Sequence, residues 1–557
     1  MLLSALAGHS AARVIWVDPT HASATDGGIG LKAQPLKTIK RAAAIARAGD
    51  VVTVLPGEYR EKDIEIVFSG TRAQPIVFQA AFPGTVRVIG GPQVESYTRD
   101  ESPILFGDRD RQAANHELWS GAEYITVRGM TFENAQGVAI AAGTGWRIED
   151  CRVRWAMYDG IVARGDDITI ARTVVEDSGN NGMTGGFGKN ISIVDSIIRR
   201  SNRIGNAPGD TTGASKFLWT TGLRVAGLVS YDNFGSGWWM DWNNVDYSVT
   251  GCTIFGNHAG EAMQKGWLVN QYWAGSGIWT EGNPGPGRIA DNLIYSNVGS
   301  GIGVLESMDV VVENNDIFDC GRGIELRDVL REDGANDANR IRRVMNVTIR
   351  GNRIKAWRDD AAIATSVGEW SRGRDPSGYK VSFNGNVFDP VGDRSLLLWL
   401  NHTPLRLSPA LNLLGESNKI EKLPTLEPAI KTYSTELRER NNPVDVRFRQ
   451  VDSQQAEQRS ILDALSGRAI GDTIVIPVAG RRAVTVREQG GWACDVYDLA
   501  AATRARLMLP DEASVSLLKS ILMPHATLKP VSLNVRLRSI DPYNIEAELL
   551  GPVPHSR

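Results

Sequence analysis

A short strand-like segment recurs through the middle of the chain, and this repeat constrains the fold more than any other feature of the sequence. From about residue 124 to 389, runs rich in β-branched residues alternate apolar and polar positions, which is typical of strands with one buried face. The tightest steps between run starts are 21 to 24 residues. The runs begin at Tyr124, Trp146, Asp167, Asn190, Leu223, Tyr247, Gly287, Asp309, Asn346 and Tyr379.

A period of this length, with strands and no helix between them, predicts a right-handed parallel β-helix in which each coil stacks on the last. Leucine-rich repeats have a similar period, but their leucine-asparagine signature is absent. We therefore expect an all-β solenoid with an N-terminal helical cap and a small C-terminal β domain.

One column of the repeat supports this alignment independently. Counting from each strand start brings six residues to the same turn: Cys151, Cys252, Asn292, Asn315, Asn352 and Asn386. Stacked asparagine amides can satisfy one another and the bent backbone, and cysteine at this position is interpreted as a small buried residue. Because the four cysteines lack metal-site spacing, neither a metal site nor a required disulfide is predicted.

Changes in composition divide the chain into five segments. Residues 1–12 resemble the tail of a secretory signal without its positive region, so a secreted or periplasmic location is expected. Residues 13–95 would form the cap and first coils, with a helix opened by residues 35–39 and running to Ala48. The main β-helix is expected over 96–415, a linker over 416–444, and a small β-sandwich-like domain over 445–557.

The overall charge and hydropathy exclude some classes of partner. A net charge of -3 gives no basic footprint for nucleic acid. No apolar stretch is long enough to cross a membrane. No cofactor is predicted, and the sequence does not indicate an oligomeric state.

Two segments of the repeat share a phrase that ends in a carboxylate. Residues 235–241 read Gly-Ser-Gly-Trp-Trp-Met-Asp, and residues 275–281 read Gly-Ser-Gly-Ile-Trp-Thr-Glu. Strand alternation points Asp241 and Glu281 outward, and neighbouring coils are about 4.8 Å apart. Stacked carboxylates at this spacing approach the roughly 5–5.5 Å typical of retaining glycosidases. Outward acids also occur on β-helices without a catalytic role.

A lysine gives the two acids different roles. Allowing a one-residue insertion or deletion, Lys216 occupies the place of Asp241 one coil earlier. A nearby ammonium group favours an ionised carboxylate, so Asp241 would be the nucleophile and Glu281 the general acid/base.

Aromatic residues near the acids suit sugar binding, although tryptophans in loops also serve local packing. The predicted substrate-binding set is Lys216, Trp219, Trp239, Trp242, Trp279 and Glu306. Glu306 would lie one coil after Glu281 and one residue out of register, either lining the site or as a solvated turn residue. A long tryptophan-bearing loop over 263–273 is a further sugar-binding candidate.

Several of these segments resemble a known enzyme family. Gly49-Asp50, residues 57–61 (Gly-Glu-Tyr-Arg-Glu) and residues 89–91 (Ile-Gly-Gly) are similar to the start of β-helical, pectate-lyase-like glycoside hydrolases. Residues 214–216, 239–242 and 279–287 resemble the active-site segments of the β-xylosidases of family 120, with the related family 141 next. The resemblance implies glycoside hydrolysis, with Asp241 as nucleophile and Glu281 as acid/base.

The chain departs from that family in one respect. The family inserts a sizeable β-sandwich after the first coils, whereas only residues 92–121 fill that place here. A more open cleft would accept a longer or differently decorated glycan.

The function predicted from the sequence is thus retaining hydrolysis of plant or microbial polysaccharide-derived glycans, xylosides among them, through a glycosyl-aspartate. Two alternatives remain open. A polysaccharide lyase on the same fold would use Lys216 or a neighbouring arginine as base, often with Ca²⁺. A non-catalytic glycan-binding protein is the other.

Overall fold

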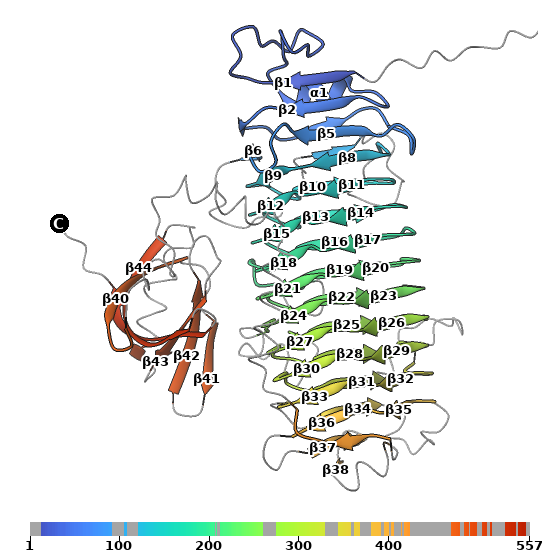
Figure 1. The fold of residues 1–557 in the computed structure, drawn as a ribbon, viewed down its shortest axis with the longest axis vertical. Coiled ribbons are helices and arrows are strands. Elements are labelled where there is room, and N and C mark those ends of the chain that lie inside the picture. Colours follow the sequence, from blue (N-terminus) through green and yellow to red (C-terminus); the bar gives the residue numbers. More distant parts are fainter. Residues whose placement is uncertain are drawn as a thin grey trace, which may run out of the picture.

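A computed structural model describes most of the repeat region and part of the C-terminal region (Figure 1). The predicted signal remnant, most of the predicted linker and the loop over 263–273 lie outside the described residues. The residues that the structure describes are 13–91, 105–107, 121–206, 208, 212–259, 274–328, 343–357, 361–367, 380–390, 395–399, 403–405, 414, 417–423, 469–479, 484–488, 491–497, 504–509, 513–514, 530–541 and 544–552.

Three long sheets run along the solenoid, and each successive coil adds one strand to each sheet (Figure 1). Sheet 1 contains β1 (Val14–Val17), β2 (Val51–Val54), β5 (Ile76–Ala80), β8 (Ile125–Arg128), β11 (Arg147–Glu149), β14 (Thr169–Ala171), β17 (Ser192–Val194), β20 (Arg224–Ala226), β23 (Tyr247–Thr250), β26 (Gly287–Ala290), β29 (Val310–Glu313), β32 (Thr348–Arg350) and β35 (Ser382–Asn384).

Sheet 2 carries the predicted acids. It contains β4 (Ile64–Ile66), β7 (Leu105–Gly107), β10 (Ile140–Ala142), β13 (Ile161–Arg164), β16 (Met183–Gly186), β19 (Ser215–Leu218), β22 (Trp238–Asp241), β25 (Ile278–Glu281), β28 (Ile302–Leu305), β31 (Ile324–Asp328), β34 (Ala361–Val367), β37 (Ser395–Trp399) and β38 (Thr403–Leu405).

Sheet 3 completes each coil. It contains β3 (Gly57–Tyr59), β6 (Val86–Ile89), β9 (Met130–Glu133), β12 (Arg152–Arg154), β15 (Val174–Glu176), β18 (Ile197–Arg199), β21 (Val229–Tyr231), β24 (Thr253–Phe255), β27 (Leu293–Tyr295), β30 (Asp316–Phe318), β33 (Arg353–Lys355), β36 (Val387–Asp389) and β39 (Lys419–Ile420). β39 pairs in parallel with β36, so coil pairing extends past the expected end at residue 415.

The core lies inside the three sheets and is built from equivalent residues of successive coils. Ile148, Ile170, Ile193 and Val225 stand in register on neighbouring strands of sheet 1 and are fully buried. Each such aliphatic side chain contributes about 1.5–3 kcal/mol when it leaves water. The alternation seen in the sequence therefore positions the strands, and the expected parallel β-helix is confirmed.

The predicted asparagine column is confirmed as a hydrogen-bonded ladder between coils. The Asn292 amide nitrogen donates to Asn315 Oδ1 at 2.8 Å, Asn315 donates to Asn352 at 2.9 Å, and Asn352 donates to Asn386 at 3.0 Å. Cys252 continues the column, and its backbone N–H donates to Asn292 Oδ1 at 2.9 Å. Cys252 is fully buried, and this burial raises the pKa of its thiol to about 12, which fits the structural role predicted for it.

The N-terminal helix, α1 (Ile39–Ile45), is shorter than expected. Its N-cap is Thr38, whose side chain accepts a hydrogen bond from the Arg41 N–H. The prediction that it runs to Ala48 is wrong, because Ala46 already has extended backbone angles and the chain turns toward β2. The helix buries Ile39, Ala42 and Ala43 in the solenoid core at its N-terminal end (Figure 1).

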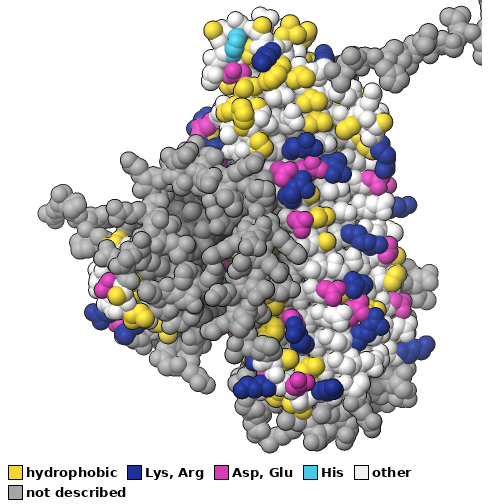
Figure 2. Space-filling view, in the orientation of Figure 1, with side chains coloured by type: hydrophobic (Ala, Val, Ile, Leu, Met, Phe, Trp, Pro, Cys, Tyr) yellow, Lys and Arg dark blue, Asp and Glu magenta, His cyan; other side chains and the backbone are white. Residues whose placement is uncertain are grey.

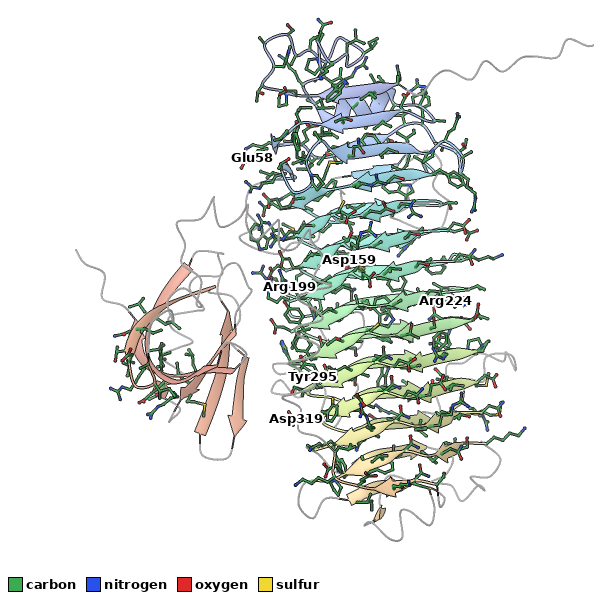
Figure 3. The ribbon with its side chains drawn as sticks, in the orientation of Figure 1. Glu58, Asp159, Arg199, Arg224, Tyr295 and Asp319 are labelled. Carbon is green, nitrogen blue, oxygen red and sulfur yellow. The ribbon has the colours of Figure 1, made fainter. Side chains whose placement is uncertain are left out.

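The outward side of sheet 3 carries a mixed column of charged and aromatic residues. Glu176, Arg199, Tyr231, Phe255 and Tyr295 stand in register on successive coils. Figure 3 shows Arg199 and Tyr295 along the same side of the solenoid. The rings of residues 231, 255 and 295 stack at centroid distances of 4.8 and 4.7 Å.

Glu176 binds several arginines in the charged part of this column. Its carboxylate accepts hydrogen bonds from Arg152 at 2.6 Å, Arg199 at 2.7 Å and Arg200 at 2.8 Å. Burial alone would favour the neutral acid, but these arginines hold the pKa of Glu176 well below its usual range. Figure 2 shows basic and acidic side chains close to one another on the described part of the face in view.

The C-terminal strands form a separate six-stranded sheet of mainly antiparallel pairs. Its order is β40 (Thr473–Ala479), β44 (Pro530–Asp541), β45 (Asn544–Pro552), β43 (Arg504–Leu509), β42 (Gly491–Tyr497) and β41 (Val484–Glu488). A sandwich needs two facing sheets, whereas these described strands belong to one sheet, which curls in Figure 1. Among the described residues, no helix has the length and apolar character needed to span a membrane.

Candidate active site

The two predicted acids lie side by side on neighbouring strands of sheet 2. β22 and β25 pair in parallel, with Trp239 opposite Trp279 and Asp241 opposite Glu281. The predicted stacking of the acids is confirmed, and the spacing between neighbouring strands is about 4.8 Å. Trp238 packs inside the main core, as alternation requires.

Lys216 contacts Asp241, although its predicted register is wrong. Its Nζ lies 3.0 Å from Asp241 Oδ2, and both side chains are mostly buried. The same ammonium group lies 4.0 Å from the centroid of the Trp239 ring. Phe217 pairs with Met240, so Lys216 falls in the column of Trp239, two residues before the place of Asp241. The long side chain spans this offset.

Trp239 and Trp279 form an outward but covered layer with Leu305. Trp239 is 1% exposed and Trp279 is 0% exposed, so neither presents an open ring face to solvent. The Trp279 indole N–H instead donates to Glu281 Oε2 at 3.2 Å. In the described geometry these two tryptophans contact Lys216 and Glu281 and can orient them.

Two glycines leave space for the rings of two tryptophans near Glu281. Gly303 pairs with Trp279, and a Cβ at Gly303 would lie 1.9 Å from the Trp279 ring. A Cβ at Gly282 would lie 2.3 Å from the Trp242 ring. Real side chains do not tolerate such distances, so both glycines are needed for the indoles to occupy these places. Glu281 as a whole residue is 6% exposed.

The turns after β19, β22, β25 and β28 each begin with a left-handed residue. Trp219, Trp242, Gly282 and Glu306 have φ values of 55, 46, 60 and 45°. Glu306 follows Leu305, the partner of Glu281, so it is one residue out of register as predicted. It is 2% exposed, which makes the interpretation as a solvated turn residue wrong.

A second asparagine ladder, which the sequence reasoning missed, supports the backbone beneath the acids. Asn283 Oδ1 accepts from the Asn244 N–H at 2.7 Å and from its amide group at 3.0 Å. The Asn283 amide group donates to Met240 O and Thr280 Oγ1, both at 2.9 Å. The signal was available: Asn244 and Asn283 follow Asp241 and Glu281 by three and two residues.

A buried polar cluster lies on the coils before Lys216 and was also missed. Asp159 accepts hydrogen bonds from Asn180 at 2.8 Å, the Asn181 N–H at 2.9 Å and Thr184 at 3.1 Å. Thr184 pairs with Lys216 in sheet 2. Burial raises the pKa of Asp159, although these hydrogen bonds oppose the shift. Figure 3 labels this residue on the body of the solenoid.

The described residues contain no group of three or more His, Cys, Asp and Glu side chains placed to hold a metal ion. The described part of sheet 2 brings Asp241, Glu281 and Lys216 together. They can provide a carboxylate nucleophile and a proton donor on one face.

The comparisons with known proteins concern the fold. A family model described as a right-handed beta helix region matches residues 136–272 and 268–389. Together with the sheet topology, this match identifies the chain as a right-handed parallel β-helix. A search of curated proteins finds no match.

Solved structures with related coils include carbohydrate-active enzymes. XylC in complex with xylose is 14% identical, with 69% of this chain and 85% of that chain covered and a TM-score of 0.47. A GH136 lacto-N-biosidase from Eubacterium ramulus is 12% identical, covering 74% and 68%, at a TM-score of 0.46. Pectate lyase Pel9A is 18% identical, covering 68% and 80%, at 0.39. Likenesses at this level do not determine this chain's activity.

Proposed function

We propose that this protein is a retaining glycoside hydrolase that cleaves its substrate through a covalent glycosyl-Asp241 intermediate. The observation that carries the proposal is the register of Asp241 with Glu281, combined with the ion pair between Lys216 and Asp241. Retaining enzymes need two carboxyl groups roughly 5–5.5 Å apart, and adjacent parallel strands supply about 4.8 Å between backbones. The active-site segments that resemble family 120 give the same assignment.

In the first step, an Asp241 oxygen attacks the anomeric carbon. The bond from that carbon to the leaving oxygen breaks, and Glu281 transfers its proton to this oxygen. The Lys216 ammonium group stabilises the negative charge of Asp241 before attack and reduces its repulsion of Glu281. The Trp279 N–H holds one oxygen of Glu281, which fixes the direction of the carboxyl group.

In the second step, Glu281 removes a proton from water, and the water oxygen attacks the same carbon. The bond to Asp241 breaks, and the sugar leaves with its original anomeric configuration. The two tryptophans beside Glu281 reduce its contact with solvent, which strengthens electrostatic interactions during both steps.

Separate substitutions of the two acids test the proposal. We expect Asp241→Ala and Glu281→Gln to lower kcat by about 10²–10⁴-fold on activated aryl glycosides. Azide should rescue Glu281→Gln with a glycosyl azide of retained configuration, and Asp241→Ala with the inverted product. Asp246→Asn is the matched control, since this exposed acid five residues after Asp241 pairs only with surface Arg224 in the described contacts.

The substrate panel should pair neutral aryl glycosides, including xylosides, with uronate polymers. Full activity in both acid variants would refute the assigned roles. Products that absorb as unsaturated uronates would instead show the lyase reaction, and glycan binding without any turnover would show the non-catalytic alternative.

A further inference from the structure

An aromatic stripe runs along the solenoid from the acid pair toward the N-terminal coils. Phe187, Trp219 and Trp242 each directly follow a strand of sheet 2, on three successive coils. All three begin the turn in a left-handed conformation, with φ values of 56, 55 and 46°. The equivalent position on the next coil is Gly282, directly after Glu281.

Two members of the stripe are unusually exposed for large aromatic residues. Trp219 is 44% exposed and Phe187 is 38% exposed. Their ring planes are inclined by only 14°, and their centroids are 6.3 Å apart. Because this distance exceeds the coil spacing of about 4.8 Å, the rings are offset and each leaves part of its surface open.

The stripe is continuous with the acid pair. The Trp242 ring lies against Gly282, where a Cβ would be 2.3 Å away, so its indole reaches the coil of Glu281. At the other end, the Arg164 guanidinium carbon lies 5.7 Å from the Phe187 centroid. The stripe thus begins one coil before Glu281 and covers three coils, and its two exposed rings are those of Trp219 and Phe187.

One position beside the stripe carries no side chain. Arg164, Gly186, Leu218 and Asp241 occupy the outward position before the turn on successive strands. Gly186 has no side chain, and a Cβ there would lie 1.8 Å from the Leu218 carbonyl oxygen. Residue 186 therefore places no side chain beside the Phe187 ring.

We propose that the stripe of Phe187, Trp219 and Trp242 forms subsites for an extended, predominantly neutral glycan whose chain runs along the solenoid axis. This inference rests on the proposed hydrolase function, and it specifies a polymeric substrate in place of a single terminal sugar. Pyranose rings present apolar C–H faces that pack on aromatic surfaces. Their repeat in an extended chain is of the same order as the coil spacing of about 4.8 Å.

The acid pair and the stripe then have different functions. The carboxyl groups act on one glycosidic bond, and the rings bind the sugars beyond it. The benefit should increase with chain length, because a longer chain reaches Trp219 and then Phe187. A monosaccharide aryl glycoside would contact neither of these two residues.

Affinity electrophoresis tests binding without requiring turnover. Native gels would contain soluble xylan, mannan, mixed-linkage β-glucan or polygalacturonate, and would compare the wild type with Trp219→Ala and Phe187→Ala. We expect at least one neutral polymer to retard the wild type. Each variant should weaken that binding by about three- to tenfold. Phe82→Ala is the matched control, because Phe82 is 61% exposed on an early coil outside the stripe.

A second measurement separates this inference from the proposed function. Relative to their own kcat/KM on a short aryl glycoside, the two variants should lose about three- to tenfold on a hexasaccharide of the retarding polymer, whereas Phe82→Ala should keep the wild-type kcat/KM on both substrates. Unchanged retardation in both variants, or no retardation of the wild type by any polymer, overturns the subsites. Intact retardation without any hydrolysis would instead refute the hydrolase and leave the binding stripe standing.

Discussion

Asn283 offers a sharp test of how the fold positions the acids. Its side chain makes four hydrogen bonds, two accepted from Asn244 and two donated to Met240 and Thr280. These groups belong to the coils of Asp241 and Glu281. Asn283→Ala removes all four bonds and leaves the Asn244 backbone N–H without its acceptor.

The magnitude follows from the number of bonds. At about 1 kcal/mol net for each hydrogen bond, the substitution should destabilise the β-helix by about 4 kcal/mol. For a cooperative unit of about 400 residues, this corresponds to a Tm lowered by about 5 °C. If the acids shift by about 1 Å, kcat should also fall by about 10²-fold.

Asn315 provides a matched control from the other ladder. It also makes four side-chain bonds, two accepted from Asn292 and two donated to Ile289 O and Asn352. Asn315→Ala should therefore lower Tm by the same amount while leaving kcat within about twofold, since its bonds do not support the acid-bearing turns.

Thermal unfolding followed by circular dichroism, with initial rates measured well below Tm, compares the two variants. The reasoning is wrong if Asn283→Ala unfolds within 1 °C of the wild type. It also fails if Asn315→Ala loses as much activity as Asn283→Ala, because the ladder beneath the acids would then have no local effect on the site.

Two further substitutions probe the packing and charge of the solenoid. Gly303→Ala should displace the Trp279 ring from Glu281, lower kcat at least about tenfold and reduce the free energy of unfolding by about 1–3 kcal/mol. Gly28→Ala is the control, because a Cβ there would meet only ordinary contacts. Equal rates in the two variants would contradict this role of Gly303. Glu176→Gln should destabilise the fold by about 3–5 kcal/mol at neutral pH in urea unfolding. The pKa of Glu176 is lower in the folded state, so its contribution to stability is present above its unfolded pKa and is lost as pH falls through the folded pKa. The unfolding curves of the wild type and Glu176→Gln should therefore converge in strong acid. Curves that stay equally separated at low pH would argue against this linkage.

The features that could be predicted from the sequence are those in which each coil contacts an equivalent of itself. Strand alternation assigned the inward and outward sides of β22 and β25, because one face must enter the core. The asparagine column could be predicted for a similar reason, since each amide pairs with the same group one coil away. In a repeat, a pattern read within one coil therefore also predicts contacts between residues at equivalent positions of neighbouring coils.

The register of Lys216 could not be predicted in the same way, because the turn after Asp241 is irregular. Phe217 pairs with Met240, and Thr221 then bridges to Val245, so the acid-bearing coil has one more residue in this turn. An insertion was allowed for, but it displaces Lys216 toward Trp239 and not toward Asp241. Side-chain length restores the ion pair that backbone register alone does not supply.

The glycines around Glu281 show how a repetitive scaffold can carry a specific site. The turns after β16, β19, β22, β25 and β28 begin with a left-handed residue, and the aromatic series ends at Gly282, where the ring of Trp242 needs the space. Gly303 leaves equivalent space for Trp279 on the other side. Two positions without side chains therefore leave space for the indole rings of Trp242 and Trp279 near Glu281, while the strands keep their ordinary register. Such glycines change the surroundings of a residue without changing the fold. Positions at which a coil departs from the repeat are therefore the places where a chemical function is to be sought.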